Sequence, residues 1–226
     1  SFQLKNLSMA ILAARVCKMN NHQIKKALTN IKNVNGRLNL IKKYPNDIRV
    51  FVDYAHTPDA LHEVLKSLKD IYNNNVSLVF GCGGERDFKK RSMMAKIARS
   101  FCEKIYVTDD NPRKENPKKI RQEIVKNLKS SKYFNIGNRF QAIKKAVLNA
   151  APNETILVAG KGHETFQDYG SKIISISDKE IIQKLRLSKD NFIIKKQNYV
   201  FNSKIINKVL KNKIIYKCNG LAIDSR

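Results

Sequence analysis

An alternation of short apolar segments with helical patterns runs through the middle of the chain and limits the folds open to it. Four segments rich in Val, Ile, Leu and Phe have the length of buried strands, and a polar or glycine-rich turn follows each one. Strands without polar alternation are typical of parallel sheets buried on both faces. The pattern therefore predicts an α/β fold, with a Rossmann-like, mostly parallel sheet and helices on both of its faces. The predicted strands are 48–54, 76–81, 104–108 and 155–159.

Helical spacing predicts a short helical lead-in before the first strand and a helix after each strand. Thr57 and Ser177 stand where N-caps are expected, and Pro58 suits a first helical turn. Beyond residue 202 the pattern changes and predicts a small α+β tail, with a helix at 203–210 and a strand at 214–216. The other predicted helices are 6–19, 21–30, 58–71, 92–101, one from 117, 139–150 and 178–187, with a further strand at 172–176.

Polar clusters stand where the four strands end. In open α/β sheets, ligands bind in the crevice at the carboxyl ends of the strands. We therefore expect the four clusters to meet in one binding site. They are DYAH at 53–56, GCGG at 81–84, DDNPR at 109–113 and GKGHE at 160–164.

The first cluster has two interpretations. Asp53, Tyr54 and His56 suit hydrogen bonding to a ribose and packing beside a base. The same segment is also typical of an ordinary strand-to-helix turn with Thr57 as its cap. Residue types alone favour the turn.

The glycine-rich segment at 81–87 would let the backbone approach a ligand closely, and Arg86 stands where it could pair with a carboxylate. This segment is not a phosphate-binding loop. Neither GxxxxGK[ST] nor GxGxxG occurs in the chain.

The last two clusters carry the charges that a zwitterionic amino acid requires. Arg113 offers a bidentate cation for a carboxylate, while Asp110 and Glu164 offer acceptors for an ammonium group. Each cluster also has a plainer explanation, a turn for the first and a flexible loop for the second. Residue types alone leave both explanations open.

The chain is strongly basic, with 44 Lys and Arg residues against 19 Asp and Glu and a formal net charge of +25. Such an excess raises nucleic acid as a partner, because clustered cations displace counterions from phosphates. Here the cations are spread over every predicted helix beside many Ile and Asn residues, as a compositional bias would also produce. We therefore expect no nucleic-acid binding. The alternative hypothesis, from another functional class, is a basic nucleic-acid-binding module.

Membrane insertion is not expected, because no stretch approaches the roughly 20 apolar residues that span a bilayer and no secretory signal pattern opens the chain. Cys17, Cys82, Cys102 and Cys218 lie far apart without a Cys-x-x-Cys pair. Free thiols in a reducing compartment are expected, without a metal site. These features together predict a soluble, cytoplasmic protein.

Taken together and in this order, four blocks resemble the Mur ligase family, and within it the members that add diaminopimelate. The resemblance covers about residues 1–187. It implies an ATP-dependent ligase that adds meso-2,6-diaminopimelate to UDP-N-acetylmuramoyl-L-alanyl-D-glutamate in peptidoglycan biosynthesis. The blocks are VDYAHTPDAL at 52–61, VFGCGGERD at 79–87, VTDDNPR at 107–113 and VAGKGHE at 158–164.

The resemblance also implies how the work is divided. In the family, a central domain carries the P-loop, the magnesium ligands and a modified lysine, and a first domain binds the UDP-sugar. ATP phosphorylates a carboxylate, and the amine of the incoming amino acid attacks the acyl phosphate. This domain would position the amine, so no catalytic residue is expected in the chain. The resemblance implies ATP and Mg²⁺ as cofactors. It implies meso-diaminopimelate, the UDP-N-acetylmuramoyl-dipeptide and ATP as binding partners, and a monomeric protein.

Site residues follow from the same resemblance, position by position. Arg113 is the residue that lysine-adding members lack. It can pair the extra carboxylate of meso-diaminopimelate, whereas lysine would leave its guanidinium desolvated and unsatisfied. Glu85 stands where Asp is more usual. The residues expected to contact meso-diaminopimelate are Arg86, Asp110, Asn111, Pro112, Arg113, Gly160 and Glu164, and those on the nucleotide side are Arg37, Asp53, Tyr54 and His56.

The domain organisation follows as an expectation. Residues 1–37 would end the central domain, 38–188 would form the C-terminal domain, 189–202 a linker, and 203–226 the start of a MurF-like N-terminal domain. The chain begins without Met, so a fragment of a longer polypeptide, such as a fusion of two consecutive ligases, is expected. A related folylpolyglutamate synthase is a further alternative, against which DNPR and GKGHE argue.

Overall fold

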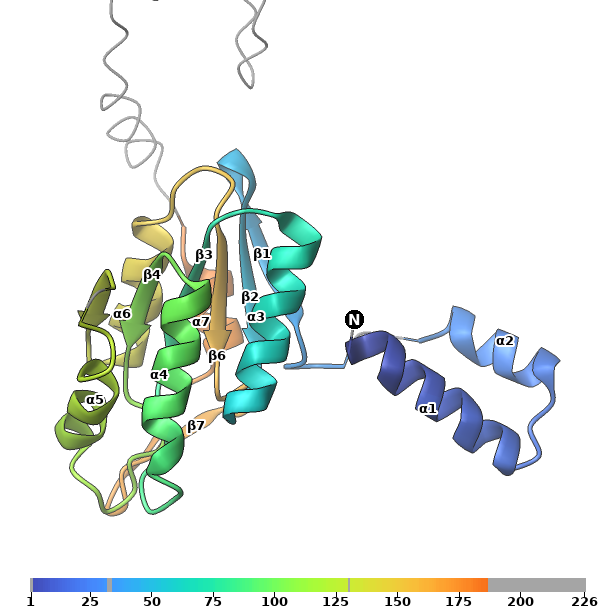
Figure 1. Cartoon of the computed structure of the whole chain (residues 1–226), viewed down its shortest axis with the longest axis horizontal. Helices are drawn as coiled ribbons and strands as arrows, with labels where there is room; N and C mark the ends of the chain where they lie inside the picture. Colours follow the sequence, from blue (N-terminus) through green and yellow to red (C-terminus); the bar gives the residue numbers. More distant parts are fainter. Residues whose placement is uncertain (1, 32–33, 130, 187–226) are drawn as a thin grey trace, which may run out of the picture. The chain divides into compact units, whose positions relative to one another are not determined.

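A six-stranded sheet forms the centre of the computed structural model, which describes residues 2–31, 34–129 and 131–186. The strand order is β1-β2-β6-β3-β4-β5, and every neighbouring pair except β1 with β2 is parallel (Figure 1). This arrangement confirms the predicted α/β fold. The strands are β1 (Asn39–Tyr44), β2 (Ile48–Asp53), β3 (Val76–Phe80), β4 (Lys104–Val107), β5 (Tyr133–Asn135) and β6 (Thr155–Ala159).

Helices cover both faces of this sheet, as predicted. On one face, the buried strand residues Phe51, Leu78 and Leu157 share a core with helices α3, α4 and α5. Their neighbours along the strands, such as Val50 and Val79, are equally buried on the opposite face, where α6 and α7 pack. Burial of each such side chain contributes about 1.5–3 kcal/mol. The helices are α3 (Pro58–Tyr72), α4 (Lys89–Phe101), α5 (Pro117–Val125), α6 (Arg139–Leu148) and α7 (Asp178–Lys184).

Side-chain caps fix where several helices begin. The predicted caps are confirmed: the Thr57 hydroxyl accepts from the Ala60 amide at the start of α3, and Ser177 accepts from the Glu180 amide at the start of α7. Helix α4 begins three residues before its predicted start. The sequence did not reveal this start, because Phe88 at the N-cap position offers no capping side chain. The lead-in contains the two predicted helices, α1 (Phe2–Val16) and α2 (Asn21–Thr29), the second of which begins with a capping box.

Three short strands were not predicted from the sequence. Strand β1 is an irregular antiparallel edge with a register shift between Leu40 and Lys42, and β5 has three residues, none of them buried. Strand β7 (Phe166–Asp168) pairs with the predicted β8 (Ile173–Ser175) in a separate antiparallel hairpin. Such short or half-exposed strands lack the apolar run on which the prediction depends. The predicted linker 189–202 and the tail 203–226 lie outside the described residues.

None of the helices within the described ranges is long and apolar enough to cross a membrane.

A buried ion pair joins the sheet to the two helices on one face. Arg139, at the start of α6, donates from Nε and Nη2 to the two carboxylate oxygens of Asp178, both at 2.7 Å. Its Nη2 also donates to the carbonyl of Ala159 at 3.0 Å. Burial alone would lower the pKa of Arg139, but the charge and hydrogen bonds of Asp178 more than offset it, so the pKa is raised. The guanidinium is therefore a permanent cation, although both side chains are fully buried.

We predict that Asp178→Ala lowers the free energy of unfolding by about 3–5 kcal/mol, because it leaves a buried guanidinium without its counter-charge. Denaturant unfolding of the whole chain, followed by circular dichroism, measures this loss. Lys184→Ala is the matched control: it breaks an exposed pair with Glu180 on the same helix, and we expect a change below about 1 kcal/mol. Equal losses for the two variants would contradict the prediction.

Candidate functional site

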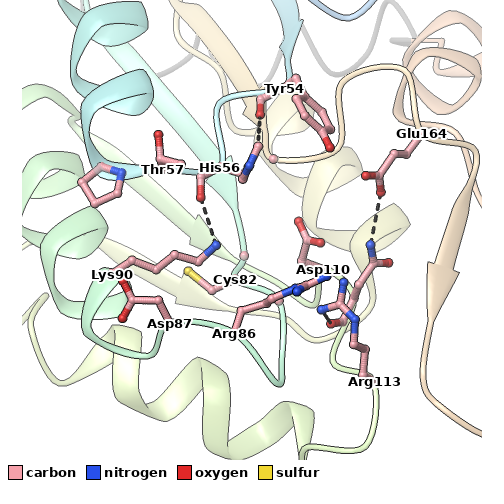
Figure 2. Close-up of a pocket in the computed structure, with 15 residues that line it drawn as sticks. Tyr54, His56, Thr57, Cys82, Arg86, Asp87, Lys90, Asp110, Arg113 and Glu164 are labelled. Carbon is pink, nitrogen blue, oxygen red and sulfur yellow. Dashed lines mark hydrogen bonds between the residues drawn. The ribbon is translucent and has the colours of Figure 1, made fainter.

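The carboxyl ends of the parallel strands open into a cleft of about 450 Å³. Residues from all four predicted clusters line this cleft, as expected for an α/β sheet (Figure 2). The lining residues come from the loops after β2, β3, β4 and β6 and from the first turns of α3 and α4. The predicted residues that line the cleft are Tyr54, His56, Arg86, Asp110, Asn111, Arg113, Gly160 and Glu164.

The loops that carry the two arginines pack directly on one another. The Gly84 amide donates to the Asn111 carbonyl at 2.9 Å, and Arg113 Nη1 donates to the Gly84 carbonyl at 2.7 Å. A Cβ at Gly84 would lie 2.0 Å from the Pro112 carbonyl oxygen, so no other residue fits there without a backbone shift. Pro112 thus contributes backbone packing and does not line the cleft. Close approach of the two backbones brings both guanidinium groups to the same cleft.

The hairpin of β7 and β8 holds the second of these loops from behind. Arg113 has a φ of +52°, which is unusual for a residue with a side chain. Its amide donates to the Asp168 carbonyl at 2.9 Å, and the Asp168 amide donates to Asn111 Oδ1 at 3.0 Å. The hairpin therefore fixes both a strained backbone and an amide side chain of the cleft.

Two of the predicted carboxylates, Asp110 and Glu164, line the cleft with these cations. Burial is the largest effect on the pKa of Glu164 and raises it, but hydrogen bonds from Lys161, Asn111 and Tyr54, with the charge of Lys161, bring the net pKa below its ordinary value. Glu164 is therefore ionised at neutral pH. Asp110 is buried, and a Cβ at Gly160 would lie 2.7 Å from its Oδ2, so the glycine leaves room for this carboxylate.

The predicted nucleotide-side residues divide into two layers. Tyr54 and His56 line the cleft, with their ring centroids 4.6 Å apart. Arg37 lies over the Tyr54 ring, 4.8 Å from its centroid, and does not line the cleft. Asp53 is buried and accepts from the amides of Leu38 and Ala55 at 2.5 and 2.7 Å. Arg37 and Asp53 thus support the wall of which Tyr54 forms the surface.

Close backbone contact also joins residue 36 to the loop after β6. A Cβ at Gly36 would lie 2.4 Å from the His163 amide nitrogen, and a Cβ at Gly162 would lie 2.9 Å from the Gly36 carbonyl oxygen. Both glycines have a positive φ. Neither position can take a side chain without separating the two segments.

Several residues of the site were missed by the sequence reasoning. Lys90 and Asp87 line the cleft, and the Lys90 ammonium donates to the His56 carbonyl at 3.1 Å (Figure 2). Lys90 belongs to the uncapped start of α4, which the helical pattern did not include. Lys161 was noted within its motif, but nothing in the sequence indicated that it is buried. Arg91 is also buried, and it pairs with Glu115 and Glu123 behind the Arg86 loop.

Within the described residues, no group of three or more His, Cys, Asp and Glu side chains is arranged to hold a metal ion. The residues present do not fit a magnesium site by themselves, and we assign no metal-binding role to them.

Comparisons with known proteins bear on the family and the fold of the chain. Residues 36–162 match the family described as Mur ligase, glutamate ligase domain. The chain is 42% identical over 187 residues to the UDP-N-acetylmuramoyl-L-alanyl-D-glutamate--2,6-diaminopimelate ligase of Rickettsia felis, covering 82% of this chain and 34% of that protein. A solved structure of a ligase with the same name is similar with a TM-score of 0.62 and 32% identity, covering 80% of this chain and 37% of that chain.

A folylpolyglutamate synthase from Thermotoga maritima shares the fold, with a TM-score of 0.51 and 23% identity over 70% of this chain and 35% of that one. The chain spans about a third of the length of the curated relatives it matches. The family match includes the clusters at the ends of β2, β3 and β4 and most of the cluster after β6. The chain therefore belongs to the Mur ligase family.

Proposed function

We propose that this chain supplies the amino-acid-binding part of an ATP-dependent ligase that adds meso-2,6-diaminopimelate to UDP-N-acetylmuramoyl-L-alanyl-D-glutamate. One observation carries the proposal: Arg86 and Arg113 line the same cleft as Asp110 and Glu164. The names of the curated relatives, which cover most of the chain, support the same substrate.

The charges of the cleft match those of the proposed amino acid. Meso-diaminopimelate carries two carboxylates and two ammonium groups at neutral pH. Arg86 and Arg113 provide planar donors for the carboxylates, and Asp110 and Glu164 provide acceptors for the ammonium groups. A substrate with one carboxylate fewer, such as L-lysine, would leave one guanidinium without a partner, which costs affinity.

The proposed reaction needs an amine held beside an activated carboxyl group. ATP supplies the phosphoryl group that activates the carboxylate of the UDP-linked dipeptide. This phosphorylation releases ADP. The substrate ammonium group loses a proton to water to become the attacking amine. A new C–N bond forms between its nitrogen and the carbonyl carbon, the C–O bond to the phosphate breaks, and inorganic phosphate and a second proton leave. The residues of this chain bind and orient the amino acid, so that two reactants meet with a high effective concentration. We assign Tyr54 and His56, with Arg37 and Asp53 behind them, to the nucleotide side of the cleft.

The rest of the ligase would lie in the part of the relatives that this chain does not match. Residues 1–37 would end the ATP-binding domain, and 38–188 would form the C-terminal domain. We place the P-loop and the Mg²⁺ ligands in the unmatched part. For 189–202 we propose a linker and for 203–226 the start of a MurF-like domain. We also propose that the ligase is cytoplasmic, because its UDP-linked substrate and ATP are cytoplasmic. The resemblance to the family further implies a monomer.

Arg113→Ala in the complete ligase is expected to raise the KM for meso-diaminopimelate about 100-fold, because the guanidinium partner of one carboxylate is lost. The KM for ATP should change less than about threefold, and discrimination against L-lysine should fall. Steady-state kinetics with each substrate varied in turn measures these effects. Lys114→Ala, which removes the neighbouring exposed cation, is the control. An unchanged KM for meso-diaminopimelate would remove Arg113 from the site.

The 226-residue chain alone should neither hydrolyse ATP nor form the peptide bond, because it contains no phosphate-binding loop. Phosphate release and product formation, assayed with all three substrates present, test this expectation. Ligation by the isolated chain would contradict the division of work between domains.

A further inference from the structure

Lys161 is a buried cation whose contacts all belong to the cleft or its supporting loops. Its side chain is fully buried and does not line the cleft. The ammonium donates to Glu164 Oε2 at 2.9 Å and to Asn111 Oδ1 at 3.1 Å, and it lies 5.5 Å from the centre of the Phe166 ring. An ammonium group buried without such partners would be strongly destabilising. Lys161 therefore requires both acceptors to stay in place.

The charge of Lys161 also decides how the Asn111 amide is oriented. Asn111 Oδ1 accepts from Lys161 and from the Asp168 amide, and an NH₂ group turned toward these two donors could not accept from either. The NH₂ group must then point the other way, where it donates to Glu164 Oε2 at 3.2 Å. The three side chains form a closed triangle of hydrogen bonds, with the carboxylate held by two donors at a single oxygen.

We propose that Lys161 is a positioning residue for the amino-acid substrate, because it holds Glu164, both directly and through Asn111, in the orientation in which the carboxylate accepts from the substrate ammonium group. The inference rests on the proposed function and adds to it a residue that touches no substrate. It predicts that Lys161 acts through Glu164 and leaves nucleotide binding unchanged.

The electrostatic surroundings of Glu164 give this role a signature in pH. Lys161 on its own loop, Tyr54 from the end of β2 and Asn111 from the loop after β4 act on it directly, and the Arg139 charge from α6 also interacts with it. Arg86, Asp110 and Arg113 line the same cleft as Glu164. Burial is the largest effect on the pKa of Glu164 and raises it, while the hydrogen bond and charge of Lys161 lower it. Loss of Lys161 is therefore expected to raise this pKa. Substrate binding that needs the ionised carboxylate would then weaken as the pH falls, whereas the lowered pKa of Glu164 in the parent predicts no such weakening near neutral pH.

The experiment is a kinetic comparison of Lys161→Met with the parent in the complete ligase, from pH 6 to pH 9. We expect the KM for meso-diaminopimelate to rise about 10- to 100-fold, with a larger rise at pH 6 than at pH 9, and the KM for ATP to stay within about twofold. Lys172→Met makes the same change on an exposed lysine of the β7–β8 hairpin and is the matched control. It should leave all constants unchanged.

A double-mutant cycle with Glu164→Gln tests whether Lys161 acts through the carboxylate. In the double variant no buried charge is left unpaired, so it should fold even if Lys161→Met alone does not. Its KM for meso-diaminopimelate should be no higher than that of Glu164→Gln alone. A KM more than about tenfold higher would overturn the inference, since Lys161 would then act independently of Glu164.

Two further results would overturn the inference while the proposed function stands. One is a Lys161→Met enzyme whose KM for meso-diaminopimelate equals that of the parent at every pH. The other is an equal rise in the KM for ATP and for meso-diaminopimelate, which would indicate a general loss of structure. Failure of the proposed function itself looks different: the parent enzyme would not use meso-diaminopimelate at all.

Discussion

The buried guanidinium of Arg139 is the contact on which the geometry of the cleft depends. It holds Asp178 of α7 and the carbonyl of Ala159, and its Nη1 lies 3.5 Å from the carbonyl of Asp109. Ala159 and Asp109 are the residues directly before Gly160 and Asp110. One cation therefore sets the separation of the two strand ends from which the acceptor loops depart. Because a buried charge is stable only when it is fully paired, the protein cannot relax this contact without losing much of its stability.

The cleft is assembled in layers, and its surface residues have little freedom of their own. The Arg113 amide donates to the Asp168 carbonyl, and the Arg113 side chain donates to the Gly84 carbonyl. Lys161 donates to the carboxylate of Glu164. Arg91, with two carboxylates, supports the loop that carries Arg86. A site for a small and highly charged ligand needs such support, because the positions of its charges decide affinity more than the area of contact does.

Regular patterns in the sequence predicted the elements of the structure that depend on them. Apolar runs such as Thr155–Ala159 predicted the central strands, and the polar residues after them predicted the cleft. They did not predict β7, a three-residue strand without an apolar run, or the burial of Lys161, because a lysine beside glycines gives no sign of its surroundings. The burial of Lys161 depends on contacts with Asn111, far away in the chain. Nor did they separate Asp53, with both oxygens bound to backbone amides, from the side chains at the cleft surface.

The contact between Gly36 and Gly162 has a mechanical consequence. Two main-chain segments are in direct contact there with no side chain between them. A displacement of one segment therefore cannot be absorbed by a change of side-chain rotamer. The loop that bears Lys161 and Glu164 is thus in direct backbone contact with the segment around Gly36, which leads into β1. A small rotation of residues 34–38 would therefore displace the loop that carries the acceptor Glu164.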